Sequence, residues 1–252
     1  MQRNDPLKSI VLAYISARVN LSLEGGTERT PDGATLAVSG APVASLNAVI
    51  SPDLDPDAKT METLAGSEAL AGLPWSLNVR GRPKAGVIDV ARRHGLTHTT
   101  VLPLMIRYPQ AGQPAVDNGV LVRPVDGDEM TVYARALADG WGVPHEVFAL
   151  FANPALADTE GFTFYLAESD GELVGTGMAA VQGDLLGVFN IGVLPRYRRQ
   201  GHGKAITTEI VRAHYAEGAT TAYLYSSPMG ESVYAAAGFK EQEVLTMFMA
   251  PS

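Results

Sequence analysis

The sequence predicts an α/β protein with two domains, and three observations support this. The chain has 252 residues, which is long enough for two small hydrophobic cores. Its apolar fraction of 46% and charged fraction of 18% are typical of folded proteins. Short β-branched and apolar runs alternate with segments of helical periodicity in both halves. Residues 108–114, rich in proline and glycine, read as a linker, so we expect the boundary near residue 115 and domains over residues 1–114 and 115–252.

The first domain begins with a segment of helical spacing. Asp5 is a suitable N-cap and Pro6 a suitable first helical residue, and the apolar stripe predicts a helix over residues 5–17. The turn at residues 51–57 leads into a second helix. We expect the remaining elements of this domain to be strands over 35–38, 44–50, 75–79 and 97–106 and helices over 58–71 and 83–94.

The second domain has sharper turn signals. Asp170-Gly171 lies between two alternating runs and predicts a hairpin. A helix over residues 204–217 carries Ile206, Ile210 and Ala213 as its buried stripe. The other expected elements are strands over 120–125, 162–168, 173–181, 186–193, 220–226 and 244–249 and helices over 127–140, 145–153 and 230–237. No tandem repeat of fixed short period is evident.

The net charge of −8 falls on residues 118–252, and a cluster of cations within this acidic segment indicates a local anion site. Four of the eight cationic side chains of this segment lie together, at Arg196, Arg198, Arg199 and Lys204. A solvated basic turn is the alternative interpretation of such a cluster. The acidic background argues against nucleic acid, which requires a broad basic surface.

Several classes of site and location are disfavoured by composition. The absence of cysteine excludes a thiolate nucleophile, a disulfide framework and a cysteine-based zinc site. His94, His98 and His214 form no recognisable metal-ligand pattern, so no metal is expected. The N-terminus lacks the apolar core of a signal peptide, and no apolar run is long enough to span a bilayer. We therefore expect a soluble, cytoplasmic protein without a membrane partner.

The strongest chemical signal is the octapeptide Arg198-Arg199-Gln200-Gly201-His202-Gly203-Lys204-Ala205, which follows an apolar strand and opens an amphipathic helix. Glycines allow a tight turn, and the N–H groups at the start of a helix, together with its dipole, bind phosphate. A Walker loop is excluded because Ala205 stands where Ser or Thr is required. A dinucleotide fingerprint is excluded because Ile206 replaces the third glycine. The segment therefore predicts a diphosphate-binding turn.

This loop resembles the Gln/Arg-x-x-Gly-x-Gly/Ala motif of the GCN5-related N-acetyltransferase (GNAT) superfamily, with matches at Arg198, Gly201 and Gly203. Residues 225–239, which include Tyr234 and end in Gly238-Phe239, resemble the family's closing segment. The resemblance covers about residues 118–252 and implies the GNAT fold there, a mixed, mostly antiparallel sheet flanked by helices. Residues 73–79 and 94–96 resemble fragments of a smaller, degenerate GNAT-like α/β domain, as in two-domain members of the family.

The resemblance implies acetyl-CoA or another acyl-CoA as the cofactor. The amide of Val193 would lie near the thioester carbonyl, and Tyr234 would be the general acid that protonates the departing thiolate, although a core role for Tyr234 is the alternative. The implied cofactor-binding residues are Ile191, Gly192, Val193, Arg198, Arg199, Gln200, Gly201, His202, Gly203, Lys204 and Ala205. We expect His202 to point to solvent or to the ribose phosphate.

A general base is the missing part of this assignment. Many family members carry a carboxylate on the strand before the loop, but residues 186–193 contain no acid. Glu168, at the end of another strand, is the candidate that remains, while His145 reads as a surface residue. A base elsewhere in the chain, a chain of water molecules and a domain without catalytic activity are the alternatives to Glu168.

The resemblance implies acyl transfer, most simply of acetyl, to an amine of a small molecule or peptide. An acyl-CoA-binding sensor or scaffold without transferase activity is the alternative, and transfer to a hydroxyl or decarboxylation of a malonyl thioester is a third. In the first domain, Trp75 and Asn78 either wall the acceptor pocket or belong to a scaffold core. The sequence leaves the oligomeric state open, a homodimer included.

Overall fold

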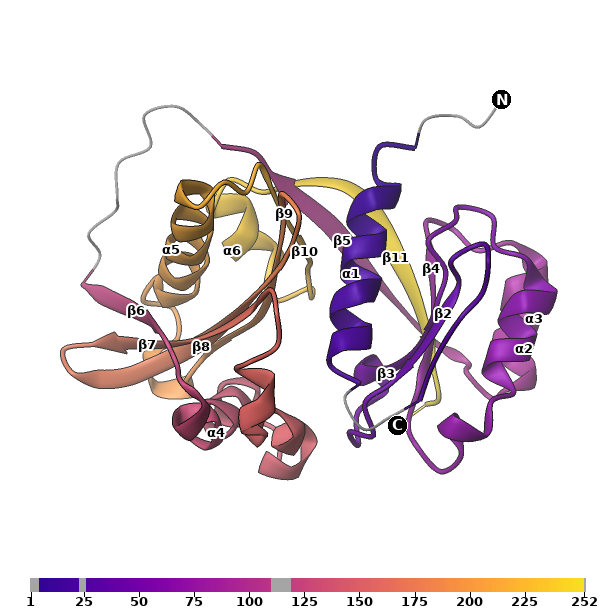
Figure 1. The fold of residues 1–252 in the computed structure, drawn as a ribbon, viewed down its shortest axis with the longest axis horizontal. Helices are drawn as coiled ribbons and strands as arrows, with labels where there is room; N and C mark the ends of the chain where they lie inside the picture. Colours follow the sequence, from indigo (N-terminus) through magenta and orange to yellow (C-terminus); the bar gives the residue numbers. More distant parts are fainter. Residues whose placement is uncertain (1–4, 23–25, 110–118, 252) are drawn as a thin grey trace. The chain divides into compact units, whose positions relative to one another are not determined.

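The computed structural model describes residues 5–22, 26–109 and 119–251 of the chain (Figure 1). The chain forms two compact units, each with its own internal contacts. Unit 1 consists of Met1–Leu104 together with Gln242–Ser252, and unit 2 consists of Met105–Glu241. The expected boundary near residue 115, with most of the expected linker, lies outside the described residues.

Two strands cross from one unit to the other. β5 (His98–Arg107) begins in unit 1 and ends in unit 2, whereas β11 (Lys240–Met249) begins in unit 2 and ends in unit 1. The sequence places the last strand in the second domain, but in the structure it pairs antiparallel with β4 (Ser76–Arg80) of unit 1. The expected division is therefore wrong at its C-terminal end, because local sequence does not reveal which distant strand will be a partner.

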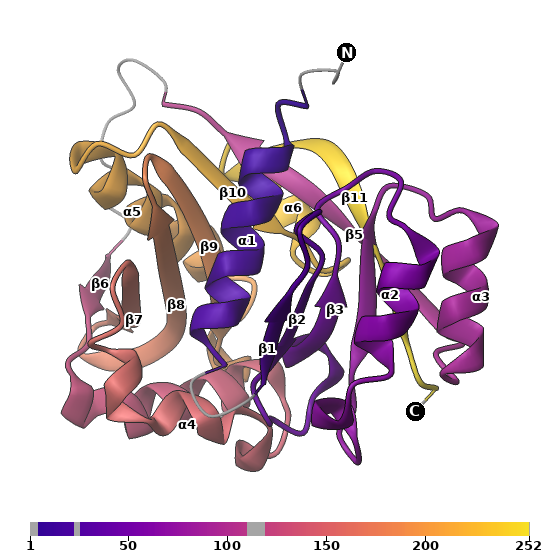
Figure 2. The same cartoon turned by 45° about the vertical axis from the view of Figure 1, so that its right-hand side comes forward.

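Unit 1 is a sheet covered by helices on both faces. The β1–β2 and β2–β3 pairs are antiparallel, and β3 and β4 are parallel. Figures 1 and 2 show α1 (Lys8–Asn20) on one face and α2 (Ala58–Ala65) and α3 (Ala85–Arg93) on the other. The strands lie in the order β1 (Thr27–Arg29), β2 (Thr35–Val38), β3 (Asn47–Ile50), β4 and β11.

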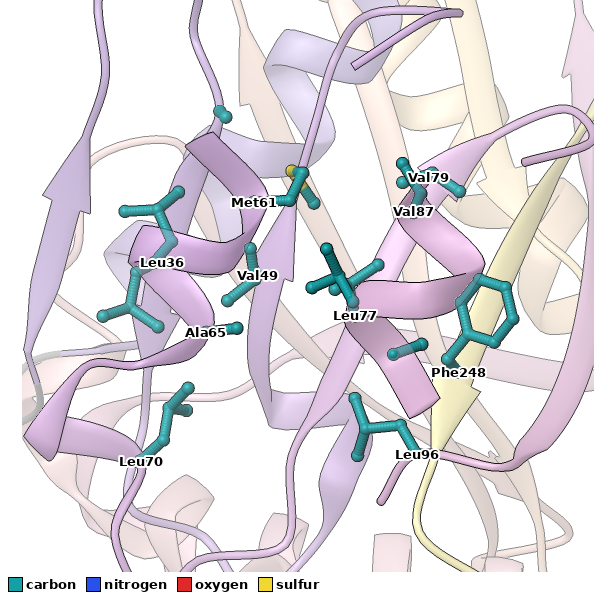
Figure 3. Close-up of a cluster of buried hydrophobic side chains, with 14 of the residues drawn as sticks. Leu36, Val49, Met61, Ala65, Leu70, Leu77, Val79, Val87, Leu96 and Phe248 are labelled. Carbon is teal, nitrogen blue, oxygen red and sulfur yellow. The ribbon is translucent and has the colours of Figure 1, made fainter. Parts of the chain in front are cut away.

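The hydrophobic core of unit 1 lies between the sheet and the two helices α2 and α3. Val49, Leu77 and Phe248 come from three strands and pack with Met61 of α2 and Val87 of α3 (Figure 3). Full burial of a side chain of this size stabilises the fold by about 1.5–3 kcal/mol. Because side chains alternate along a strand, the neighbours of Leu77 on β4 face the side that α1 covers.

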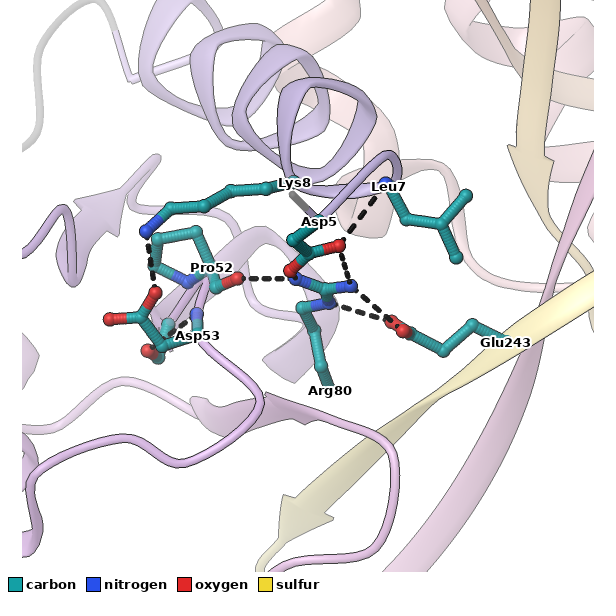
Figure 4. A network of polar contacts seen from close by, with 8 residues as sticks. Asp5, Leu7, Lys8, Pro52, Asp53, Arg80 and Glu243 are labelled. Atoms are coloured by element: carbon teal, nitrogen blue, oxygen red, sulfur yellow. Dashed lines mark hydrogen bonds and ion pairs between the residues drawn. The ribbon is translucent and has the colours of Figure 1, made fainter. Parts of the chain in front are cut away.

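That opposite face of β4 contains a buried arginine (Figure 4). Arg80 is 1% exposed, and its Nη1 and Nη2 donate to the Asp5 carboxylate at 2.5 and 3.0 Å. Nε and Nη2 donate to the Glu243 carboxylate at 2.7 and 2.8 Å, and Nη1 also donates to the Pro52 carbonyl at 2.8 Å. A buried guanidinium requires such partners. The hydrogen bonds of Arg80 join β4 to three other segments, namely the chain before α1, the chain after β3, and β11.

Unit 2 is also built on hydrogen-bonded strands with helices on both faces. β9 and β10 are parallel, and the remaining neighbours are antiparallel. Figure 1 shows α4 (Met130–Trp141) on one face and α5 (His202–Ala216) on the other, and α6 (Glu231–Ala236) follows β10. The strands lie in the order β10 (Thr221–Tyr225), β9 (Leu185–Val193), β8 (Glu172–Gln182), β7 (Phe162–Ser169) and β6 (Val120–Pro124).

The core of unit 2 confirms part of the helical stripe predicted for α5. Ile206 and Ile210 are both fully buried and pack with Val174 of β8 and Leu186 of β9. The order of strands and helices also agrees with the sequence prediction. The segment expected as a helix over residues 145–153 is instead a 3-10 helix, His145–Ala152, with non-helical backbone at Phe148.

Two elements of unit 1 are shorter than predicted. α2 ends at Ala65, because the chain turns at Gly66, and a 3-10 turn, Glu68–Leu70, occupies the rest of the expected helix. The strand expected over residues 44–50 begins at Asn47, after a 3-10 turn over Ala44–Leu46. Asn47 is fully buried, and its Nδ2 donates to the Ala41 and Pro74 carbonyls at 2.8 Å each, which fixes this start.

Both units repeat one local topology. In unit 1, β2 and β3 are antiparallel, and α2 then leads to β4, which is parallel to β3. In unit 2, β8 and β9 are antiparallel, and α5 then leads to β10, which is parallel to β9. The repeat lies in the order and direction of the elements, which explains why no repeated sequence pattern indicates it.

Candidate functional site

The candidate site is built around the C-terminal end of β9. β9 pairs with β10 only from Leu185 to Gly187, whereas it pairs with β8 as far as Val193. Leu194 N donates to Val174 O at 2.9 Å. Because every second residue of an antiparallel strand bonds to the same neighbour, this bond shows which residues of β9 face β8 with their N–H groups. Gly192 and Leu194 therefore bond toward β8, and the N–H of Val193 points to the side away from β8.

The loop after β9 leads to a helix start with free donors. Gly201 has φ 87° and forms the N-cap position of α5, where no side chain of the described residues caps the helix. The first backbone bond of the helix is Ala205 N to Gly201 O at 3.0 Å. Among the described residues, no backbone hydrogen bond engages the N–H groups of residues 201–204. These groups are available to an anion.

The corresponding helix of unit 1 begins differently. α2 follows β3 as α5 follows β9, but its N-cap residue Asp57 accepts a hydrogen bond from Thr60 N at 2.8 Å. A carboxylate of the protein thus occupies the position where an anion would bind. The cationic segment of residues 80–86, which lacks the motif spacing, lies instead between β4 and α3.

Arg198 binds main-chain carbonyls of the protein itself. Its Nε donates to Val193 O at 3.3 Å, and its Nη2 donates to Gly140 O at 3.0 Å. The side chain therefore joins the loop, the end of β9 and the end of α4. Arg199 and Lys204 are exposed residues beside the helix start, and Arg199 has φ 63°. These two side chains are the cations of the loop that remain open to a ligand.

Two other predicted residues of the loop face the protein. His202 was expected to reach solvent or a ribose phosphate, but it is 9% exposed and lies edge-on to Tyr197, with ring centroids 6.2 Å apart. The expectation that the His202 side chain points to solvent is therefore wrong, because its position on α5 turns the ring inward, while a contact with a ribose phosphate stays a prediction. Ala205 is also buried, and its N–H is used within the helix. Gln200 is exposed, with Nε2 3.4 Å from Arg196 O.

Gly203 is the point at which three elements meet. A Cβ placed on it would lie 3.6 Å from Val193 Cγ2 of β9 and 3.5 Å from Val233 Cγ1 of α6. The helix start, the end of β9 and α6 are therefore packed together. Tyr234 is the next residue of α6, so the predicted acid and the predicted amide belong to neighbouring elements.

Tyr234 is suited to remain protonated. Burial raises the pKa of its hydroxyl to about 12, and its ring lies edge-on to Phe239 at 6.2 Å. Within the described part of the chain, its hydroxyl makes no hydrogen bond. A neutral phenol with an uncommitted O–H is able to donate a proton or a hydrogen bond to a thiolate. The role of Tyr234 stays a prediction.

Glu168 is held in an ion pair. Arg123 Nε donates to Glu168 Oε1 at 2.9 Å, and the same guanidinium binds both oxygens of Glu129 at 2.8 Å. Glu168 lies at the end of β7, which is two strands away from β9 in the sheet. The structure therefore gives its carboxylate a partner in Arg123, and its role as a base stays a prediction without geometric support.

α4 contributes residues that the sequence did not single out. Asn190 Nδ2 donates to the Tyr133 hydroxyl at 3.1 Å, and Asn190 has φ 53°. Gly140 packs on the main chain of Gly192 and Val193. Asparagine tolerates positive φ better than most residues, and this is the signal in the sequence that could have indicated a bend within the strand.

The remaining candidates lie elsewhere. In unit 1, Trp75 packs against the hydrophobic core and lies edge-on to His94, and Asn78 is fully buried. In unit 2, His145 is exposed and bound to Asp139 at 2.9 Å, while His214 is buried and bound to Tyr165.

None of the described helices combines the length and apolar character needed to cross a membrane. No group of three or more potential metal-binding side chains occurs among the described residues.

Comparison with known protein families identifies the domain that holds the site. Residues 160–241, which run from β7 through α6, match the model of the acetyltransferase (GNAT) domain. Over these residues the chain is similar to a GNAT acetyltransferase domain. The matched region includes β9, the glycine loop, α5 and Tyr234, so the resemblance inferred from the motifs is confirmed.

Two relatives of this chain are named mycothiol acetyltransferases. The protein from Streptomyces avermitilis is 38% identical over 165 residues, which cover 58% of this chain and 53% of that protein. The protein from Streptomyces griseus is 37% identical over 94 residues, which cover 35% of this chain and 31% of that protein. This chain thus spans about half of the first relative and about a third of the second.

Solved structures share the whole fold. A GCN5-related N-acetyltransferase from Kribbella flavida superposes with a TM-score of 0.69 at 17% identity, covering 99% of this chain and 97% of that one. Another from Sphaerobacter thermophilus gives a TM-score of 0.61 at 17% identity, covering 88% and 78%. These likenesses concern the fold, and they confirm the expected mixed, mostly antiparallel sheet flanked by helices.

Proposed function

We propose that the protein transfers an acetyl group from acetyl-CoA to an amine. The observation that supports this most directly is the uncapped start of α5, which a short loop joins to the end of β9, where β9 pairs with β8 but no longer with β10. The N–H groups of Gly201, His202, Gly203 and Lys204 fit a diphosphate, and among the described residues no side chain caps this helix start. Other acyl-CoA thioesters would react in the same way, with another acyl group transferred in place of acetyl.

The chemistry at the thioester would rest on two groups. Val193 N–H, which points away from β8, would donate a hydrogen bond to the thioester carbonyl oxygen as negative charge develops there. The amine would attack the carbonyl carbon directly, and the C–S bond would break. Tyr234 would give its proton to the departing thiolate, since its raised pKa keeps the hydroxyl protonated at neutral pH.

The proposal assigns no residue as the base that deprotonates the acceptor ammonium to the amine that attacks. β9 carries no acid, and Glu168 is bound by Arg123. An amine that arrives already neutral needs no base before it attacks, and a water molecule can take the proton of an ammonium to bulk solvent. After the attack the nitrogen loses one more proton, which would return to Tyr234 through water. Positioning of the two reactants supplies much of the acceleration in such direct transfers.

The acceptor and the location belong to the proposal as well. The two relatives are named mycothiol acetyltransferases, so an acceptor from mycothiol chemistry is the first class to test. Peptide N-termini and small polyamines are the next classes, since unit 2 contains most of the excess negative charge of the chain. We place the reaction in the cytoplasm, where CoA thioesters are available.

The second candidate is a CoA-binding module without transferase activity. The absence of an acid on β9 and the pairing of Glu168 with Arg123 favour it. The test measures CoA release from acetyl-CoA with a panel of amines, with calorimetric binding of CoA in parallel. Binding together with amine-dependent release supports the enzyme, binding alone supports the module, and absence of binding refutes both.

Mass spectrometry of the products completes this test. N-acetylation adds an acetyl group to the amine, whereas transfer to a hydroxyl gives an ester that hydroxylamine cleaves. Malonyl-CoA as donor separates acyl transfer from decarboxylation, because only decarboxylation converts malonyl-CoA to acetyl-CoA. Tyr234→Phe is the matched variant, since it removes one hydroxyl and leaves the ring packed on Phe239.

A further inference from the structure

β9 changes course at Asn190. On β8, Thr176 lies opposite Gly192 and Met178 lies opposite Phe189, so the single residue Gly177 faces two residues of β9. This is a β-bulge, formed by Asn190 and Ile191. Asn190 has φ 53°, in the left-handed region that most residues avoid. The extra residue shifts the alternation of the strand by one position beyond the bulge.

The bulge decides where the Val193 amide points. In an antiparallel strand, successive N–H groups face opposite neighbours. With the bulge, Gly192 and Leu194 face β8, and Val193 faces the other side. Without the extra residue, the alternation would be reversed and the Val193 N–H would face β8. An amide turned toward β8 would be out of reach of a thioester on the open side.

Tyr133 holds the bulge in place from α4. Its hydroxyl accepts a hydrogen bond from Asn190 Nδ2 at 3.1 Å, and the carbonyl of Asn190 accepts one from Thr176 Oγ1 at 3.0 Å. The Tyr133 ring is fully buried and lies edge-on to Phe151 and Phe164, with centroids 6.2 and 5.1 Å away. This packing fixes the hydroxyl, so it is a rigid anchor for the asparagine.

α4 supports β9 a second time, about two turns further along the helix. A Cβ placed on Gly140 would lie 3.3 Å from Gly192 Cα and 3.3 Å from Val193 N, so a glycine permits this close approach. Gly140 O also accepts the hydrogen bond from Arg198 Nη2. The segment 190–193 is therefore held at both ends by one rigid helix.

We propose that Tyr133 and Asn190 are positioning residues for acyl transfer, whose hydrogen bond maintains the bulge that aims the Val193 amide at the donor carbonyl. The inference rests on the proposed function for the identity of the donor. Tyr133 of α4 and Asn190 of β9 would act on the reaction through the Val193 amide, and not through a contact of their own with the reacting atoms. Loss of the bond should therefore slow turnover without weakening the grip of the loop on the diphosphate.

The experiment compares three single variants with the wild type. Tyr133→Phe removes only the hydroxyl, and Asn190→Gly removes the amide while tolerating positive φ. Tyr165→Phe is the matched control, because Tyr165 is also buried in unit 2 and its hydroxyl lies 3.0 Å from His214 Nε2, on the helix α5 of the other face. For each protein, kcat, the KM for acetyl-CoA, the Kd for CoA and the melting temperature are measured.

We expect kcat to fall about five- to tenfold in Tyr133→Phe and in Asn190→Gly, as one lost hydrogen bond permits. The Kd for CoA should change less than about twofold, and the double variant should be no slower than the slower single variant, because both remove the same bond. Tyr165→Phe should keep the wild-type kcat. Equal loss of kcat in Tyr165→Phe, or wild-type kcat in Tyr133→Phe, would overturn the inference.

A second readout separates this inference from the proposed function. The amide resonance of Val193 should move in Tyr133→Phe and Asn190→Gly and stay in place in Tyr165→Phe. If the wild type acetylates no amine, the proposed function fails, and this resonance alone decides the inference. An unmoved Val193 resonance in the first two variants would then refute the anchoring role of Tyr133 and Asn190.

Discussion

The two glycines of the loop should respond to alanine in opposite ways. Gly201 has φ 87° and ψ −4°, and no atom lies within 4 Å of a Cβ placed on it. The space is free, so the cost of alanine is conformational, about 1–2 kcal/mol. Gly203 lies inside α5 with ordinary helical backbone, and its Cβ would make normal contacts with Val193 and Val233.

The two substitutions should therefore change the affinity for CoA by different amounts. In Gly201→Ala the loop can move to relieve the strain at residue 201, and CoA must then restore the original loop when it binds. The cost of about 1–2 kcal/mol would lower the affinity of the variant for CoA about five- to thirtyfold. Gly203→Ala should change CoA affinity by less than about twofold. It should also raise the melting temperature, since alanine is favoured over glycine within a helix by up to about 1 kcal/mol.

Calorimetric titration with CoA and thermal unfolding of the same samples test this pair. The reasoning fails if Gly203→Ala loses affinity as strongly as Gly201→Ala, because a phosphate would then approach the main chain on the side that the Cβ occupies. It also fails if Gly201→Ala binds CoA as tightly as the wild type.

Three further predictions concern side chains. Arg80→Ala leaves the Asp5 and Glu243 carboxylates unpaired and should lower the free energy of unfolding by about 3 kcal/mol in urea titrations at neutral pH. The Arg80 hydrogen bond lowers the pKa of Asp5 below its ordinary 3.8, so the part of the stabilisation that Asp5 contributes is lost as pH falls through its folded-state pKa. The difference between the two proteins should therefore narrow in acid, and a constant difference down to pH 2 would contradict this. Tyr234→Phe should reduce kcat more than CoA affinity, and an unaltered rate would remove its hydroxyl from the mechanism. Arg198→Lys keeps the charge but loses the planar fork that binds two carbonyls, so calorimetry should show CoA affinity reduced as much as in Arg198→Ala; full affinity of the lysine variant would show that charge alone matters.

The sequence indicated the secondary-structure elements of the site better than the side-chain contacts between them. The turn at Gly201, the helix after it and the buried stripe at Ile206 and Ile210 follow from local spacing, and the structure contains all of them. The inward turn of His202 does not follow from spacing. It depends on which side of α5 meets Tyr197, and that is a property of packing.

Arg198 shows the same limit for a motif residue. A match to the family pattern predicts a role of Arg198 in cofactor binding, which stays a prediction. The pattern does not reveal that its guanidinium binds the carbonyls of Val193 and Gly140, and Gly140 lies 58 residues earlier in the chain. Glu168 likewise has no partner nearby in the sequence, yet Arg123 lies beside it across the β6–β7 pair. Partners that are distant in sequence cannot be recognised from local pattern alone.

The sequence by itself determined the α/β class, the order of elements in unit 2 and the glycine turn with its helix, because periodicity and backbone restrictions act within a few residues. Only the tertiary structure decided that β11 joins the sheet of unit 1, that Arg80 is neutralised by Asp5 and Glu243, and that Tyr133 anchors the bulge at Asn190. These features depend on pairing and burial between segments far apart in the chain. Their energies are realised only when the whole unit has folded.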